Sequence, residues 1–460
     1  MKKLKVPHTY VIIFIIVLLA ALGTYLIPAG EYEQMEDPNT GRVVVDPESF
    51  HKVEQQPVGP FEIIQAVPKG MEDAANIIFF IFIVGGAFGM IQGTGAIEAG
   101  INKYVSYMAG KEKLLIPAIM LIFSIGGASF GMAEEILVFV PIGIALARSL
   151  GFDAITGTAM ISIGAAAGFS GGWLNPFTVG VAQGIADLPL FSGIGFRLLS
   201  WLVFLGIAIW YVFNYSMKVK KDPTKSVIYD LEQEVKEKEV KDVELTTQHI
   251  TVFVIIVLGF ISIVWGVFKY GWYITEISSM FLIMGIFSGI FGGSGVNKTA
   301  KDFVEGAKGL AFGALVVGLA RAVLIVMQNG MIIDSIIHNL AQVVSNLPST
   351  LAAVGMYGVQ IVINFFIPSG SGQAATTMPI MAPLSDLVGV SRQTAVLAYQ
   401  YGDGITNSII PTSAVLMGYL SISNIPYEKW FKWVAPLMGL WIGAGGILLI
   451  ISVLINYGPF

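Results

Sequence analysis

The sequence predicts an all-α polytopic membrane protein built from inverted repeats, and three observations predict this class. Of the 460 residues, 55% are hydrophobic and only 12% are charged, whereas soluble domains carry about a quarter charged residues. Apolar stretches near the ~20 residues that cross a bilayer recur along the chain. Each half of the chain also contains an apolar segment interrupted by a polar, glycine-rich tip. Such paired interruptions are typical of membrane proteins with two related halves.

The apolar segments predict about nine transmembrane helices plus two re-entrant hairpins and two broken helices. Uninterrupted spans are expected at residues 10–27, 76–97, 196–217, 250–268, 274–292, 309–328 and 433–455. Broken helices are expected at 154–187 and 394–420, and re-entrant hairpins at 114–150 and 350–388. Non-helical backbone at membrane depth is tolerated only where it is buried in protein or lines a water-filled cavity. The tips and breaks therefore predict a solute pathway.

Basic residues predict the orientation of these spans, because cytoplasmic loops are enriched in Lys and Arg. If each hairpin enters and leaves on one side, every basic cluster falls in the cytoplasm, and residues 331–350, which contain no Lys or Arg, fall outside. The clusters are Lys2, Lys3, Lys5, Lys103, Lys111, Lys113, Arg148, Lys218, Lys220, Lys221, Lys298, Lys301 and Lys308. This pattern predicts a multi-pass membrane protein with a cytoplasmic N-terminus.

The same orientation predicts two halves related by inversion. Residues 90–93 (MIQG) parallel 326–329 (VMQN), and each copy is followed by a hairpin, a broken helix and a final span. We therefore divide the chain into a first half at 1–217, a cytoplasmic linker at 218–248 and a second half at 249–460. The alternating Glu and Lys of the linker predict a solvated face. The outer loop at 31–67 is expected to carry a short hairpin or a surface helix.

Candidate ligands lie first at the two hairpin tips. Glu134 and Glu135 follow the first tip, where ionisable groups are costly and mark a pathway by default. One of them is the leading ligand for a substrate or cation, unless they pair with a base such as Arg321. Ser129 lies in the same glycine-rich turn. The second tip is neutral, and its candidates are Ser369, Ser371, Gln373, Thr376 and Thr377.

Further candidates lie at the helix breaks. A break exposes backbone carbonyls to a cation and N-terminal amides to an anion, and polar side chains complete either site. The candidates are Asn175 and Thr178 at the first break, and Asp403, Thr406, Asn407, Thr412 and Ser413 at the second. A coupling sodium ion or proton is expected near Asn175, Asp403 and Asn407. The alternative is that the two asparagines only cap the broken ends.

Other functional classes find little support. The chain has no cysteine, and its four histidines are scattered, so the sequence predicts no disulfide and no histidine metal site. Residues 292–299 resemble a P-loop but lack its second glycine. No Ser/His/Asp set falls in one polar region, and the net charge of −5 gives no indication of nucleic-acid binding. We expect neither an enzyme nor a cofactor other than the coupling ion.

Four motifs resemble a known family. They are 131–135 (GMAEE), 172–178 (GWLNPFT), 368–374 (PSGSGQA) and 403–412 (DGITNSIIPT). Together they resemble the YfcC-type branch of the anaerobic four-carbon dicarboxylate carrier family, within the ion transporter superfamily. The resemblance implies an elevator-like secondary transporter that forms a homodimer. Members are named as dicarboxylate carriers, short-chain fatty acid carriers and arginine/ornithine antiporters.

The acidic first tip favours one substrate class within that family. Related carboxylate carriers have Ser-Asn-Thr type tips, and this chain departs from them with Glu134 and Glu135. These two acids and Asp403, set against a single deep arginine, Arg321, predict a net anionic cavity. We expect transport of a basic or zwitterionic amino acid by arginine/ornithine-type exchange. The alternatives are a C4-dicarboxylate or short-chain carboxylate transporter coupled to sodium or protons and, from another class, a channel or membrane scaffold.

Overall fold

The structure is a computed structural model that describes residues 9–36, 43–46, 48–97, 99–100, 112–236, 245–270, 272 and 274–458. Three parts of the sequence predictions lie outside the described residues: the N-terminal lysines Lys2, Lys3 and Lys5, the cytoplasmic lysines Lys103 and Lys111, and linker residues 237–244.

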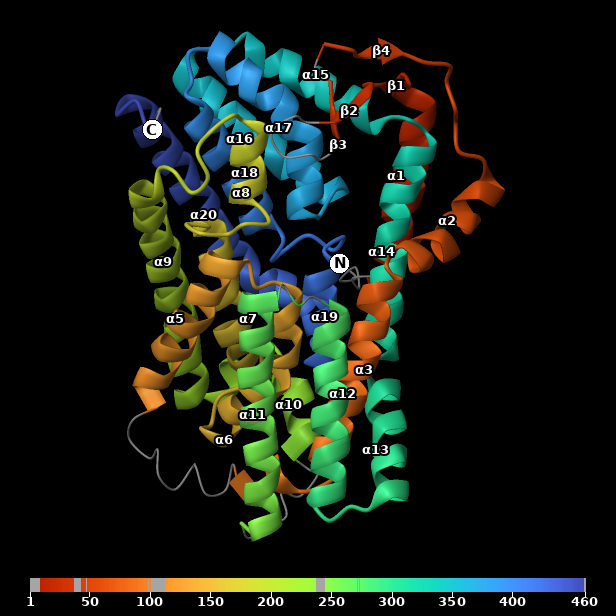
Figure 1. Ribbon diagram of the computed structural model, residues 1–460, viewed down its shortest axis with the longest axis vertical. Helices are drawn as coiled ribbons and strands as arrows, with labels where there is room; N and C mark the ends of the chain where they lie inside the picture. Colours follow the sequence, from red (N-terminus) through yellow and green to blue (C-terminus); the bar gives the residue numbers. More distant parts are fainter. Residues whose placement is uncertain are drawn as a thin grey trace, which may run out of the picture.

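The all-α class is confirmed, because helices account for nearly all of the regular structure (Figure 1). The strands of the described chain are four short ones in the outer loop, where a hairpin or surface helix was expected. β1 (Gly30–Glu31) pairs antiparallel with β4 (His51–Lys52), and β2 (Gln34–Glu36) pairs antiparallel with β3 (Val43–Val45). The loop leads into α2 (Pro60–Asp73).

The helices fall into the two predicted halves of the chain. The first half contains α1 (Thr9–Leu26), α2, α3 (Ala75–Gln92), α5 (Glu112–Phe130), η1 (Glu134–Val138), α6 (Val140–Ser149), α7 (Ala154–Gly171), α8 (Val179–Ile185) and α9 (Ile194–Lys221). The second contains α12 (Ile274–Phe291), α13 (Val296–Gly309), α14 (Ala311–Asn329), α15 (Ile333–Ser345), α16 (Ser349–Phe366), α17 (Gly370–Leu387), α18 (Arg392–Thr406), α19 (Ala414–Ile422) and α20 (Tyr427–Leu454). The predicted linker contains η2 (Pro223–Lys225) and α10 (Tyr229–Lys236), and α11 (Thr247–Tyr270) precedes α12 in the second half.

A short helix of each half packs against a helix of the other half. α2 packs on α14 of the second half, and α13 packs on α3 of the first. Glycines permit both contacts: a Cβ on Gly70 would lie 2.5 Å from the Gly318 carbonyl oxygen, and one on Gly306 would lie 2.3 Å from that of Gly85. Small residues of this kind let helix backbones approach closely inside a membrane. The reciprocal packing supports the proposal of two inverted repeats.

Six helices of the described chain are long and apolar enough to cross a membrane: α3, α7, α9, α12, α16 and α20. The pair α13 and α14, bent by 41°, would make a seventh. α16 is among the six although the sequence predicted it as a hairpin arm. It ends at Phe366, and α17 begins at Gly370 and runs back beside α18, so the arm-tip-arm form is present (Figure 1). The count of about nine spans stays a prediction.

The linker is less solvated than the sequence predicted. Glu232 of α10 is buried, and its carboxylate accepts hydrogen bonds from the Arg148 side chain at 3.0 Å and from the Ala154 backbone amide at 3.0 Å. It therefore binds the first turn of α7, where the positive end of the helix dipole favours an acid. Alternating charge in the sequence did not reveal which Glu of the linker faces the protein.

The orientation can be tested by labelling, because the natural chain contains no cysteine. Single cysteines at the exposed positions Lys221 and Lys301 should react only from the cytoplasm, and one at Asn346 only from outside. The reason is that lysine-rich loops stay in the cytoplasm. Accessibility to a membrane-impermeant maleimide in intact cells and in inverted vesicles measures this. External labelling at Lys221 would contradict the nine-span count and the inverted repeat.

Candidate functional site

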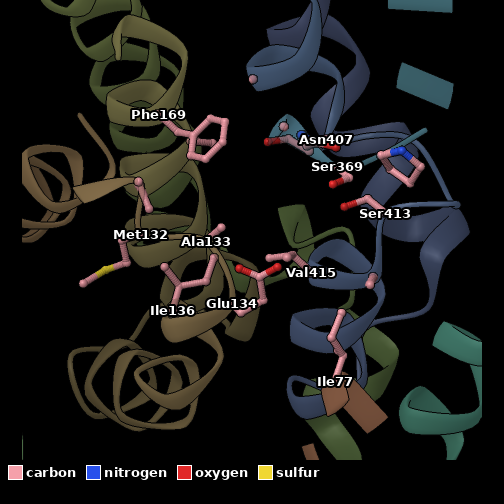
Figure 2. Close-up of a pocket in the computed structure, with 18 of the residues that line it drawn as sticks. Ile77, Met132, Ala133, Glu134, Ile136, Phe169, Ser369, Asn407, Ser413 and Val415 are labelled. Atoms are coloured by element: carbon pink, nitrogen blue, oxygen red, sulfur yellow. The ribbon is translucent and has the colours of Figure 1, made fainter. Parts of the chain in front are cut away.

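A cavity of about 330 Å³ lies where the two hairpin tips meet the helix breaks and α14. Figure 2 shows the Glu134 carboxylate between Ile136 and Val415, with Ser369 and Ser413 across from it. The first half supplies the acidic tip and part of α7, and the second half supplies the neutral tip and the second break. The cavity is therefore built from both halves.

The two acids of the first tip have different environments. α5 ends at Phe130, Gly131 adopts a φ of +70° that favours glycine, and the chain then turns into η1. The Glu135 carboxylate accepts a hydrogen bond from the Ala133 backbone amide at 3.0 Å, so it caps this turn. Within the described residues, no neighbouring side chain binds the Glu134 carboxylate, which faces the cavity (Figure 2). Glu134 is thus the acid that is available to a solute.

The first break is held to the first hairpin. Asn175 is buried, and its Oδ1 accepts hydrogen bonds from the backbone amides of Phe177 at 3.0 Å and Thr178 at 3.3 Å. The Leu174 amide donates to the carbonyl of Ala128 in α5 at 3.0 Å. Asn175 therefore satisfies backbone groups that the break leaves free. Its Nδ2 has no partner in the described chain.

The second break is held to the second hairpin by Asn364 of α16. Asn364 Nδ2 donates to the Asp403 carbonyl at 3.0 Å and to Thr406 Oγ1 at 2.7 Å. Asn407 Nδ2 donates to Asp403 Oδ1 at 3.1 Å. Asp403 is fully buried, and among the described residues its Oδ2 has no partner. An unpaired buried carboxylate oxygen is costly, so this atom is a candidate ligand.

Gly370 at the second tip lies close to residues of both helix breaks. A Cβ on this residue would lie 2.5 Å from Thr178 Cγ2 and 3.2 Å from Asp403 Oδ2. The Tyr399 hydroxyl fixes the tip by donating to the Gly370 carbonyl at 2.6 Å. Thr178 Oγ1 also lacks a partner in the described chain, so two unpartnered oxygens flank the same glycine. Such oxygens suit a small hard cation, although the described residues contain no cluster of three acidic, His or Cys side chains for a metal.

The structure places the predicted ligands in two groups. The cavity wall contains Glu134, Glu135, Thr178, Ser369, Ser371, Asn407, Thr412 and Ser413. The other candidates do not line the cavity: Ser129, Asn175, Gln373, Thr376, Thr377, Asp403 and Thr406. Several of the second group bond within their own hairpin: Ser129 Oγ donates to the Ile125 carbonyl at 2.6 Å, and Gln373 Nε2 donates to Gln360 Oε1 at 2.7 Å. Asn175 and Asp403 stay candidates because each has an unpartnered polar atom.

The prediction of a single deep arginine was wrong. Arg197 of α9 is fully buried, and its Nη2 donates to Gln393 Oε1 of α18 at 3.2 Å. It does not line the cavity. Arg321 does line it, with a side chain 33% exposed, and forms an ion pair with Asp73. The sequence did not predict Asp73 as a cavity residue, because an acid at the end of an amphipathic helix has the pattern of an ordinary surface residue.

The close approach of Gly370 to Thr178 and Asp403 can be tested by adding a methyl group at residue 370. Gly370→Ala should reduce transport by about tenfold or more, because the new methyl group would displace the tip from Thr178 and Asp403. Gly358→Ala in α16 is the matched control, since a Cβ there meets nothing within 4 Å. Uptake into proteoliposomes, with gel filtration to confirm folded protein, measures both variants. Equal uptake by both would show that the tip tolerates displacement.

Comparison with known proteins agrees with the motif analysis. The family model described as C4-dicarboxylate anaerobic carrier matches residues 6–454. The Escherichia coli (strain K12) protein YfcC, whose name assigns it provisionally to basic amino acid antiport, is 37% identical over 99% of this chain and 98% of its own. An uncharacterized Haemophilus influenzae (strain Rd) protein is 30% identical over 98% of both chains.

A solved structure is also similar. The YdaH transporter of Alcanivorax borkumensis aligns over 98% of this chain and 100% of its own, with 14% identity and a TM-score of 0.42. A score at this level does not by itself establish a shared fold.

Proposed function

The chain belongs to the C4-dicarboxylate anaerobic carrier family, a family of secondary transporters. Within this family, we propose that the chain exchanges a basic amino acid across the membrane. The family resemblance inferred from the four motifs is confirmed by the match over nearly the whole chain. The solute site in this proposal is the cavity between the two hairpin tips.

One observation supports the basic amino acid above the other substrates of the family: the Glu134 carboxylate faces the cavity, and no neighbouring side chain in the described chain binds it. The wall contains the acids Asp73, Glu134 and Glu135 but only one base, Arg321. In a site partly shielded from water, this excess attracts a cationic group and repels an anion. The name of the E. coli relative is consistent with a basic amino acid substrate.

The arrangement of the tips supports a transport mechanism as well. Two hairpins that enter from opposite ends of the molecule meet at one cavity, so each tip can separate the solute from one side of the membrane (Figure 1). In our proposal the hairpins and broken helices move in an elevator-like cycle. We further propose a homodimer in the bacterial inner membrane with cytoplasmic N-termini.

A second candidate is a carboxylate transporter coupled to sodium or protons. The observation in its favour is the pair of unpartnered oxygens, Asp403 Oδ2 and Thr178 Oγ1, beside Gly370. In this case the oxygens of Asp403 and Thr178 hold the coupling ion, and the carboxylate of the solute binds in the cavity. The description of the family model is consistent with this candidate.

Solute counterflow distinguishes the candidates. Proteoliposomes loaded with arginine or ornithine should accumulate labelled arginine, and loading with succinate or butyrate should not drive this uptake. Accumulation of labelled succinate that depends on sodium or pH would instead support the carboxylate transporter. A bilayer conductance without saturable counterflow would support a channel and contradict both transport candidates.

Substitution of the two tip acids locates the cationic subsite. Glu134→Gln should weaken arginine binding by about 10- to 100-fold, because it removes a charge-assisted hydrogen bond worth ~1.5–3 kcal/mol. Glu135→Gln is the matched control, since the amide oxygen of Gln can still accept the hydrogen bond from Ala133. Calorimetry on purified protein measures both affinities. Unchanged binding in Glu134→Gln, or an equal loss in both variants, would exclude Glu134 as the cationic subsite.

A further inference from the structure

Arg321 is an arginine with unused hydrogen-bond donors inside the cavity. Its Nε donates to Asp73 Oδ2, and this is the only hydrogen bond that Arg321 makes with the described residues. Two other arginines contrast with it. Arg148 directs three hydrogen bonds to Glu232, and Arg392 binds Asp386, Asp187 and a backbone carbonyl. The terminal Nη1 and Nη2 of Arg321 therefore stay available for a planar, bidentate acceptor.

Asp73 has a spare acceptor in the same place. Only its Oδ2 is engaged by Arg321, and its side chain is 40% exposed. Both residues line the cavity, together with Glu134. The pair thus offers two guanidinium nitrogens and one carboxylate oxygen to whatever occupies this space.

Close helix packing fixes the position of this pair. Gly70, one turn before Asp73, lies against the backbone of Gly318 and Ala322, which flank Arg321 in α14. A Cβ on Gly70 would lie 2.5 Å from the Gly318 carbonyl oxygen, so only glycine permits this approach. α2 and α14 come from different halves of the chain, and their packing places the ion pair at the wall of the cavity that Glu134 also lines.

We propose that the Asp73–Arg321 pair binds the α-carboxylate and α-ammonium groups of the transported amino acid. The α-carboxylate accepts from Nη1 and Nη2 of Arg321, and the α-ammonium donates to Asp73. The side-chain cation then extends to Glu134. This inference rests on the proposed function and makes the substrate class narrower: the solute must be an α-amino acid, and a diamine of similar length is a poor substrate.

The geometry explains why one cavity contains charges of both signs. A dicationic amine would place one of its charges beside the Arg321 guanidinium, where like charges repel. A dicarboxylate would place one of its charges beside Glu134. A basic amino acid satisfies all three side chains, because its head group carries both charges and its side chain carries only a positive one.

Arginine and agmatine, its decarboxylated analogue, test the proposal directly. Wild-type protein should bind arginine at least about tenfold more tightly than agmatine, since only arginine supplies the carboxylate. Arg321→Gln should weaken arginine binding by about 10- to 100-fold and thereby abolish this preference, without weakening agmatine binding. Arg321→Lys should retain part of the preference, because an ammonium is a point charge without the bidentate fork.

Two further variants control for indirect effects. The double variant Asp73→Asn/Arg321→Gln removes the carboxylate that Arg321→Gln alone leaves without its ion pair, and it should also lack the preference for arginine. Arg392→Gln breaks an ion pair of similar exposure, 30%, outside the cavity, and should leave the preference unchanged. Calorimetric titration of each purified variant with both compounds measures the ratio of affinities.

The outcomes separate the inference from the proposed function. If wild-type protein binds arginine but Arg321→Gln and the double variant keep the wild-type preference over agmatine, the head-group assignment is wrong and the proposed function stands. If wild-type protein binds agmatine as tightly as arginine, the assignment is also wrong. If wild-type protein binds neither compound, the proposed function fails, and the inference fails with it.

Discussion

The organisation of this protein depends on how broken backbone is satisfied inside a membrane. A helix that is interrupted at membrane depth exposes amides and carbonyls that cost several kcal/mol each if they find no partner. Asn175 meets this requirement at the first break by capping two amides, and Asn364 meets it at the second by binding the Asp403 carbonyl and Thr406. Because each break is held to the hairpin of its own half, the two tips are brought to one cavity.

Charge is distributed unevenly around that cavity, and we propose that this distribution selects the solute. Among the described residues, no neighbouring side chain binds Glu134, whereas Glu135 caps a turn, and Arg321 is only partly engaged by Asp73. A polar group whose hydrogen bonds are already satisfied gains little free energy by binding a solute, whereas a group with an unused donor or acceptor gains more. The unpartnered atoms therefore identify the positions where binding energy is available.

Much of this arrangement could be predicted from the sequence, because interrupted apolar segments have few stable solutions in a bilayer. The tips at 131–135 and 368–374 and the breaks near Asn175 and Asn407 were located in this way. Residues that act through tertiary packing were not. Asp73 reaches Arg321 across 248 residues of sequence, and Asn364 is one of the few polar residues in an apolar arm. Local pattern carries no information about such partners, and it did not show that Arg197 is buried.

The central claim is that a cationic group binds in the cavity between the two tips, at Glu134. A cryo-electron microscopy structure of the protein in lipid nanodiscs, determined with saturating arginine, tests this claim most directly. The account predicts solute density inside the cavity, with the side-chain cation within hydrogen-bond distance of the Glu134 carboxylate. Density for arginine outside this cavity, or a Glu134 carboxylate that contacts only protein while arginine is bound, would contradict it.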